Sequence, residues 1–268
     1  MIRRPPRSTQ SRSSAASDVY KRQRLSRRKH HVIRQGEDLL IPIRKVCEDL
    51  KCKIKDIDVI VFAHTDNFQC KEELKKIFKK KNIIEIDHHT CHVAAAFYSS
   101  SFSDAAIISM DGFGDGSSGL IAHGINNKIN ELIRIDDENS IGLEYLRATV
   151  HLGLGGIGAE GKTQGLAAYG EPKIFEDYMN EIEILQNGQI KLSKILKSED
   201  SLLIQEGGYL NTQFLSNQFL NNYCPRRFSH EDITTVHMNL ASSIQKVLEY
   251  LMLEISKKAA KMLSLIHI

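Results

Sequence analysis

The chain has 268 residues, of which 41% are hydrophobic, and this is enough for one large domain or two lobes with a packed core. Its five cysteines form no CxxC pair and follow no signal peptide, which favours a reduced, cytoplasmic protein over a disulfide framework. No apolar run approaches the roughly 18 residues of a membrane span, so we expect no membrane partner.

The net charge of +3 is unevenly distributed along the chain. Residues 1–30 hold ten Lys and Arg against one acidic residue, a balance of +9, so the remaining residues carry −6. A basic, Ser-rich leader is typical of a nucleic-acid arm or an organelle transit peptide. We favour a third interpretation, in which residues 1–23 are a non-native, disordered leader that resembles translated sequencing adapter and residues 263–268 are a tail of the same kind.

The segment after the leader predicts an α/β lobe with a parallel component. Glu37–Leu50 has apolar residues at helical spacing, and Ile57–Phe62 is a β-branched run typical of a strand covered on both faces. A Lys-rich helix, Lys71–Lys81, then leads to a second short strand, Ile83–Ile86. Strands that alternate with helices in this order favour parallel pairing.

A helix with two histidines follows that strand. Asp87 is a suitable N-cap for an Ala-rich helix from His88 to Ser99. His88 and His92 then lie one turn apart on the same face, which is the spacing that two imidazoles need to bind one metal ion. The spacing alone equally allows a structural role, with His88 a polar residue at the helix start and His92 a satisfied core histidine.

The next strand leads into a glycine-rich stretch. Ala105–Met110 has a buried-strand pattern that runs into Asp111, and Gly112, Gly114 and Gly116 follow. A carboxylate beside backbone N–H groups predicts a metal and anion site, although such a glycine loop, taken alone, is more often a tight turn. Two further strands, Ser118–Ile125 and Lys128–Ile135, complete an antiparallel meander through an Asn126-Asn127 turn.

A second glycine-rich section follows the predicted helix Gly142–Leu152. Lys162 is its only cation, and a cation beside flexible glycines such as Gly165 suits a phosphate oxygen. The alternative is a surface lysine on a loop. Further on, Glu183–Leu192 predicts a hairpin with an Asn187-Gly188 turn, and we assign no function to Asp200–Tyr223.

The C-terminal part of the sequence predicts one long core helix. Ser229 and Asp232 give a capping signal, and the apolar pattern runs to about Leu263. We expect His237 to be structural. The predicted core positions of this helix are Val236, Leu240, Ile244, Val247, Leu251 and Ile255.

Three of these stretches, in this order, resemble the N-terminal domain of the carbamoyltransferase family, which includes nodulation-factor and antibiotic O-carbamoyltransferases. They are His88–Tyr98, Ser109–Gly114 and Glu160–Gly170, and the resemblance extends from about Arg24 to about Ala260. It implies an α/β fold of the actin-like, sugar-kinase-like (ASKHA) type with two lobes. Residues 24–100 are then the remainder of the first lobe and residues 101–262 an incomplete second lobe, truncated at both ends.

The resemblance also implies the chemistry. The family forms carbamoyl-adenylate from carbamoyl phosphate and ATP and passes the carbamoyl group to a hydroxyl of a sugar or natural-product acceptor. The matching positions make His88, His92 and Asp111 ligands of a divalent metal, Fe or Zn. Gly112, Gly114 and Gly116 then approach the phosphate, Lys162 and Gly165 line the opposite wall, and no catalytic residue is identified.

The sequence departs from the family pattern in several places. Gln164 stands where Met is frequent and Ala159 where Gly is frequent. The first phosphate loop, the fourth metal ligand, the Ala-Gly-Gly nucleotide loop and the YrdC-like C-terminal domain of the family are not in this sequence. We therefore predict that the chain is an inactive fragment of a carbamoyltransferase whose missing C-terminal domain is its partner.

Two alternatives remain open. One is a metalloenzyme like those that pass threonylcarbamoyl to transfer RNA, but the −6 balance of the body argues against a nucleic-acid partner. The other is a non-catalytic actin-like ATP-binding module in which His88 and His92 are structural.

Overall fold

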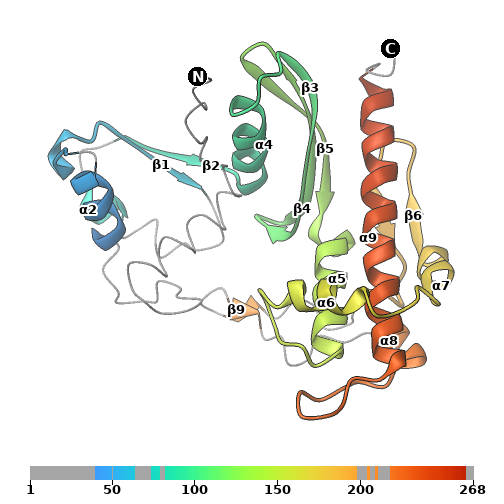
Figure 1. Cartoon of the computed structure of the whole chain (residues 1–268). Helices are drawn as coiled ribbons and strands as arrows, with labels where there is room; N and C mark the ends of the chain where they lie inside the picture. Colours follow the sequence, from blue (N-terminus) through green and yellow to red (C-terminus); the bar gives the residue numbers. More distant parts are fainter. Residues whose placement is uncertain are drawn as a thin grey trace, which may run out of the picture. The chain divides into compact units, whose positions relative to one another are not determined.

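The computed structural model describes residues 40–49, 51–63, 74–78, 82–197, 204–205, 209–210 and 218–263. The predicted leader and residues 264–268 of the predicted tail lie outside these ranges. The chain divides into two compact units, Met1–Ser101 and Phe102–Ile268, each of which is described by itself (Figure 1). Both units contain helices and strands, so the chain is mixed α/β.

The first unit contains a two-stranded parallel sheet. Strand β1 (Val59–Ala63) pairs with β2 (Asn82–Ile86) in parallel, which confirms the predicted parallel component. The helical elements among the described residues of this unit are α2 (Leu40–Asp49), the 3-10 helix η1 (Ile54–Asp56), a short α-helical segment at residues 74–77 and α4 (His88–Tyr98).

One face of this small sheet is exposed, contrary to the prediction that both faces of the first strand are covered. Val59 and Val61 are 46% and 60% exposed, and Ile84 on β2 is 42% exposed. Val61 is the register partner of Ile84, so the two side chains share one face of the sheet. The apolar run Ile57–Phe62 therefore predicted a strand correctly, but the prediction that both faces of this strand are buried is wrong.

Helix α2 ends in a Schellman motif. The amide of Cys52 donates to the carbonyl of Cys47 at 2.9 Å, and that of Lys51 donates to Glu48 at 3.0 Å. Lys51 has a φ of 54°, a left-handed conformation that glycine adopts more easily.

The second unit is built on an antiparallel sheet in the order β3-β4-β5, which confirms the predicted meander. The strands are β3 (Asp104–Gly114), β4 (Ser117–Ile125) and β5 (Lys128–Asp136). Strand β3 continues through the predicted glycine loop and is joined to β4 by a tight turn at Asp115 and Gly116, whose φ angles are 53° and 75°. Two positive φ values are typical of a type I′ hairpin turn, so of the two structures that the sequence allowed here, the tight turn is the one present.

Helices and small hairpins complete this unit. They are the 3-10 helix η2 (Asp137–Asn139), α5 (Ile141–His151), α6 (Glu160–Ala167), α7 (Phe175–Asn180), the β6 (Ile182–Ile184) and β7 (Ile190–Leu192) hairpin, the β8 (Ile204–Gln205) and β9 (Tyr209–Leu210) pair, α8 (Gln218–Tyr223) and α9 (Thr235–Met262). The α5 and α9 helices and the β6–β7 hairpin were predicted, whereas α6 replaces a predicted glycine-rich loop.

Helix α9 organises the core of the second unit. It lies beside the β3-β4-β5 sheet in Figure 1 and contacts α5, α6 and α7. Five of its six predicted core positions are at most 1% exposed, namely Leu240, Ile244, Val247, Leu251 and Ile255. Val236, the sixth, is 46% exposed.

The α9 helix starts later than predicted because another residue caps it. Thr234 is the N-cap, and His237 Nδ1 accepts a hydrogen bond from the Thr234 amide at 3.0 Å, which confirms the structural role of His237. The predicted cap, Ser229, lies in a separate turn in which the Phe228 amide donates to Glu231 at 2.7 Å. None of the helices among the described residues is both long and apolar enough to cross a membrane.

Candidate functional site

The two predicted metal-binding histidines lie at the start of a well-capped helix. The Asp87 carboxylate accepts hydrogen bonds from the Thr90 amide at 2.9 Å and from the Thr90 hydroxyl at 3.0 Å. Asp87 is thus the N-cap of α4, as predicted, and α4 begins at His88.

His88 and His92 bring their ring nitrogens together. Their Nε2 atoms are 3.1 Å apart, and both side chains are half-buried. Two imidazole nitrogens that bind one zinc ion at about 2.0 to 2.1 Å are about 3.3 Å apart at a tetrahedral angle and about 2.9 Å apart at a right angle. The observed spacing fits a shared cation, and it also fits a hydrogen bond between two neutral imidazoles.

His89 forms the buried side of this cluster and was missed by the sequence analysis. Its side chain is 0% exposed, and its ring centroid is 5.1 Å from that of His88 and 6.2 Å from that of His92. With Val93 and Phe97 it makes up the buried face of α4, spaced four residues apart. That spacing is the signal in the sequence that places His89 on the buried face of α4, behind the half-buried pair of His88 and His92.

The third predicted ligand, Asp111, lies on β3 in the second unit. Its side chain is exposed, and Oδ1 accepts a hydrogen bond from the Gly112 amide at 2.7 Å. Because Asp111 belongs to the other unit, its convergence with the two imidazoles stays a prediction.

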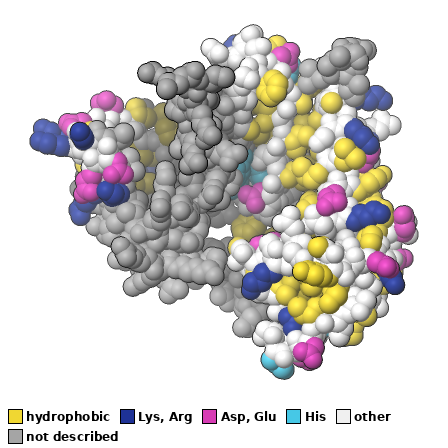
Figure 2. All heavy atoms as spheres, viewed as in Figure 1, with side chains coloured by type: hydrophobic (Ala, Val, Ile, Leu, Met, Phe, Trp, Pro, Cys, Tyr) yellow, Lys and Arg dark blue, Asp and Glu magenta, His cyan; other side chains and the backbone are white. Residues whose placement is uncertain are grey.

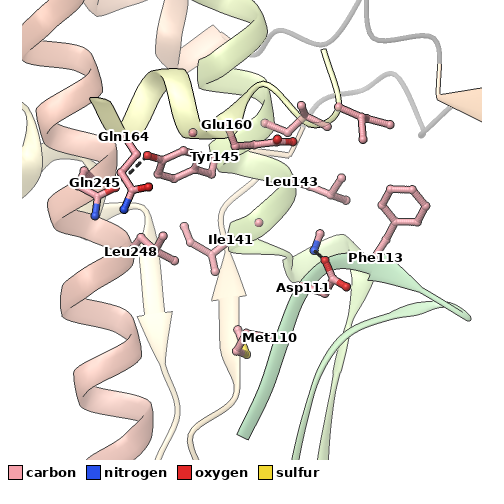
Figure 3. A pocket seen from close by; sticks show the side chains of 15 residues that line it. Met110, Asp111, Phe113, Ile141, Leu143, Tyr145, Glu160, Gln164, Gln245 and Leu248 are labelled. Carbon is pink, nitrogen blue, oxygen red and sulfur yellow. Dashed lines mark hydrogen bonds between the residues drawn. The ribbon is translucent and has the colours of Figure 1, made fainter. Parts of the chain in front are cut away.

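A pocket of about 420 Å³ opens beside Asp111 within the second unit (Figure 3). Side chains from β3, α5, α6 and α9 line it, and most are apolar. The apolar lining consists of Met110, Phe113, Ile141, Leu143, Leu146, Ile157 and Leu248. The remaining lining residues are Asp111, Gly112, Gly142, Tyr145, Glu160, Gly161, Gln164 and Gln245.

Four polar side chains besides Asp111 line the pocket, those of Tyr145, Glu160, Gln164 and Gln245. Glu160 and Gln164 lie on successive turns of α6, and Figure 3 shows both beside Tyr145. The Tyr145 hydroxyl donates to Gln245 Oε1 at 2.8 Å, which links α5 to α9. Burial, together with the carboxylates of Glu249 and Glu160, raises the pKa of Tyr145 to about 12, so this hydroxyl stays a donor at neutral pH.

The sequence analysis named Gln164 only as a departure from the family pattern and predicted no binding role for Tyr145, Glu160, Gln164 or Gln245. Glu160 and Gln164 carried a local signal, since they stand four apart in a segment that forms a helix. Gln245 carried none, because it lies 100 residues beyond its partner Tyr145.

The predicted phosphate-binding glycines fall into two groups. Gly112 lines the pocket, and so does Gly161, which was not among the predicted glycines; a Cβ added at either would meet no atom within 4 Å. A ligand in the pocket can therefore approach the backbone at both positions. Gly114 is buried and Gly116 forms the tight turn, and neither lines the pocket.

Lys162 and Gly165 do not line this pocket either. Both are exposed on α6, and Lys162 Nζ donates to the Leu154 carbonyl at 2.8 Å, so it supports the glycine-rich segment before the helix. Their predicted place on a phosphate-binding wall stays a prediction.

Comparisons with known proteins identify the family. The model of the Carbamoyltransferase N-terminus matches residues 43–266, which is most of the chain. Nodulation protein NolNO of Sinorhizobium fredii is 36% identical over 108 residues, or 40% of this chain and 16% of the relative. Nodulation protein NolO of Bradyrhizobium diazoefficiens is 30% identical over 165 residues, or 61% of this chain and 26% of the relative.

An uncharacterized protein of Synechocystis sp. is 29% identical over 180 residues, or 67% of this chain and 28% of the relative. The chain thus matches less than a third of the length of each of these relatives. Since the family model covers most of its length, the chain belongs to the carbamoyltransferase family, and residues 43–266 correspond to the N-terminal part.

Proposed function

We propose that this chain is part of a carbamoyltransferase that passes a carbamoyl group from carbamoyl phosphate, through an ATP-derived carbamoyl-adenylate, to a hydroxyl of a sugar or natural-product acceptor. The proposal rests on the family match and on a pocket of about 420 Å³, a size typical of small-molecule sites. It includes an actin-like, two-lobed architecture and a cytoplasmic location. The carbamoyltransferase C-terminal domain of the parent is its proposed partner.

One observation favours the metal, namely the 3.1 Å separation of the His88 and His92 Nε2 atoms, which is short enough for both nitrogens to bind one ion. With the Asp111 carboxylate they would offer Fe or Zn two nitrogens and an oxygen, a donor set that suits either metal. The bound ion would supply Lewis-acid stabilisation to a phosphoryl or carbamoyl oxygen. The buried His89 side chain would hold the orientation of the two imidazoles.

The pocket beside Asp111 would hold the nucleotide part of carbamoyl-adenylate. Its apolar walls suit a base, while the Glu160 carboxylate and the Gln164 amide offer hydrogen-bond partners for ribose hydroxyls. Gly112 and Gly161 let the backbone approach the ligand closely. The chain's own contribution to the reaction is then binding, orientation and the exclusion of water from one side of the adenylate.

The charge distribution fits small-molecule substrates better than transfer RNA. On the face shown in Figure 2, the Lys and Arg side chains of the second unit lie scattered among acidic and apolar ones. The residues after position 30 carry −6 in total. A tRNA substrate would favour a basic stripe.

Metal analysis of the purified chain tests the proposal. We expect about one Fe or Zn ion per chain, and loss of that ion in His88→Ala, His92→Ala and Asp111→Asn. His123→Ala is the matched control, because His123 is a partly exposed histidine on β4 that pairs with Asp104 of β3 at 2.8 Å. Equal metal content in all variants, or none in the wild type, would favour the non-catalytic module.

Nucleotide binding tests the pocket separately. Gly112→Ala adds a methyl group that meets no protein atom, so the fold should persist while the affinity for AMP, measured by calorimetric titration, falls at least several-fold. Gly165→Ala tests the predicted opposite wall in the same way, since the added Cβ also lies in open space. Unchanged AMP affinity in Gly112→Ala would remove this pocket from the proposal.

A further inference from the structure

Asp111 lies where β3 leaves its regular pairing with β4. Met110 pairs with Gly119 and Gly114 pairs with Ser117, so three residues of β3 stand opposite the single residue Ser118. The ladder therefore does not hold the backbone at Asp111 and Gly112 in place. Contacts from another element of the second unit then bear on the direction of the carboxylate.

Ser140 binds this irregular segment from the start of α5. Its hydroxyl donates to the Gly112 carbonyl at 2.5 Å and lies 3.4 Å from the Asp111 carbonyl. The same Oγ atom accepts a hydrogen bond from the Leu143 amide at 3.0 Å, which makes Ser140 the N-cap of α5. Ser140 is 1% exposed, so water does not compete for these contacts.

Gly142 provides the second contact. A Cβ at this position would lie 2.6 Å from the Asp111 carbonyl oxygen and 2.9 Å from the Gly112 Cα, both of them backbone atoms. Its φ is outside the left-handed range, so the requirement for glycine here is space and not conformation. The first turn of α5 thus packs directly against the peptide that joins Asp111 to Gly112.

The direction of the Asp111 carboxylate depends on the same peptide. Asp111 Oδ1 accepts a hydrogen bond from the Gly112 amide at 2.7 Å, so a rotation of this peptide turns the carboxylate with it. We infer that Ser140 and Gly142 are positioning residues that fix the Asp111 carboxylate for a bound metal ion. The inference rests on the proposed role of Asp111 as a ligand.

The experiment separates helix capping from positioning through substitutions at Ser140. Ser140→Ala removes both the cap and the donor, Ser140→Asp keeps a cap acceptor for the Leu143 amide but has no hydroxyl donor, and Ser140→Thr keeps both. Affinity is measured by titrating the metal-stripped chain with Co²⁺, and Gly112 amide hydrogen exchange is followed by NMR. Ser118→Ala is the control, because the Ser118 hydroxyl is buried and donates instead to the Asp136 carbonyl at 3.0 Å.

We expect Ser140→Ala and Ser140→Asp to lower the Co²⁺ affinity about 10-fold or more and to speed Gly112 exchange, with Ser140→Thr and Ser118→Ala close to wild type. Gly142→Ala should act like Ser140→Ala if it folds. Wild-type affinity and exchange in Ser140→Asp would overturn the inference while leaving the proposed function in place. If the wild type binds no Co²⁺, or if Asp111→Asn binds it unchanged, the proposed ligand role fails and the inference fails with it.

Discussion

The Nε2 atoms of His88 and His92 lie 3.1 Å apart across one turn of α4, the first helix turn after the parallel strand β2. Asp87, the residue between strand and helix, caps this turn. The geometry of the histidine pair therefore depends on where the helix begins, and the cap determines that position.

The Asp87 cap should contribute to the stability of the first unit. Asp87→Ala removes the acceptor of the Thr90 amide and should lower the free energy of unfolding by about 1 kcal/mol. Asp87→Asn, which keeps a capping oxygen, is the matched control and should stay within a few tenths of a kcal/mol of wild type. Urea unfolding followed by circular dichroism measures both. An alanine variant as stable as the asparagine variant would show that the cap does not stabilise α4.

Lys51→Gly should stabilise the first unit. Lys51 has a φ of 54° at the position where a Schellman motif prefers glycine, so glycine should raise the free energy of unfolding by about 0.5 to 1 kcal/mol. Lys45→Gly is the comparison, because Lys45 lies inside α2 and the same change there should cost about 1 kcal/mol. Thermal unfolding shows whether each variant is more or less stable than the wild type. Destabilisation by Lys51→Gly would contradict the assignment of a Schellman motif.

Removing one partner of the buried ion pair in α5 should lower the free energy of unfolding strongly, whereas replacing both partners by apolar residues should lower it much less. Arg147 Nη1 lies 3.3 Å from Glu144 Oε2, and the side chains of Glu144 and Arg147 are 0% and 9% exposed. The Tyr178 hydroxyl donates a hydrogen bond to Glu144 Oε1 at 3.3 Å. Glu144→Ala should lower the free energy of unfolding by about 3 to 5 kcal/mol, because it leaves the Arg147 charge buried without its partner. The double variant Glu144→Met, Arg147→Met should recover most of this loss. A double variant no more stable than Glu144→Ala in a denaturant series would contradict the pairing.

The stability of the second unit should fall below about pH 6.5. Burial is the main cause that lowers the pKa of His151 from 6.5, and burial also lowers the pKa of His237. The unfolded chain therefore binds more protons just below pH 6.5, so the stabilisation is complete above that pH and is lost as the pH falls through the folded-state pKa values.

Urea unfolding midpoints between pH 7.5 and 5.5 check this pH dependence. His151 Nε2 lies 2.7 Å from the Cys224 carbonyl oxygen, and the side-chain amide of His151→Gln can donate to the same carbonyl. The unfolding midpoint of this variant should therefore fall less steeply with decreasing pH than that of the wild type. An equal slope in both proteins would rule out His151 as a source of the effect.

Local patterns predicted most elements of the fold, because the forces that form them are local. The β2 strand, the Asp87 cap and the positions of the α9 core all follow from side-chain spacing. For the glycine-rich stretch after Met110 the sequence allowed both an anion-binding loop and a tight turn, and the structure has a tight type I′ turn at Asp115 and Gly116. Only the pairing of β3 with β4 decided between the two.

The candidate site was predictable only in part. The His88 and His92 spacing is a property of one helix, and the structure agrees with it. The pocket residue Gln245 comes from α9 and meets Tyr145 of α5, so no local pattern revealed it. The sequence analysis did not single out Ser140, because its hydrogen bond to the Gly112 carbonyl joins the start of α5 to β3, 28 residues earlier in the chain.

X-ray absorption spectroscopy of the zinc-reconstituted chain tests the central claim most directly. The account predicts a first shell with two imidazole nitrogens at about 2.0 to 2.1 Å and at least one oxygen, and loss of the imidazole scattering in His88→Ala, His92→Ala. An all-oxygen shell, or an imidazole signal that survives the removal of both histidines, would contradict it.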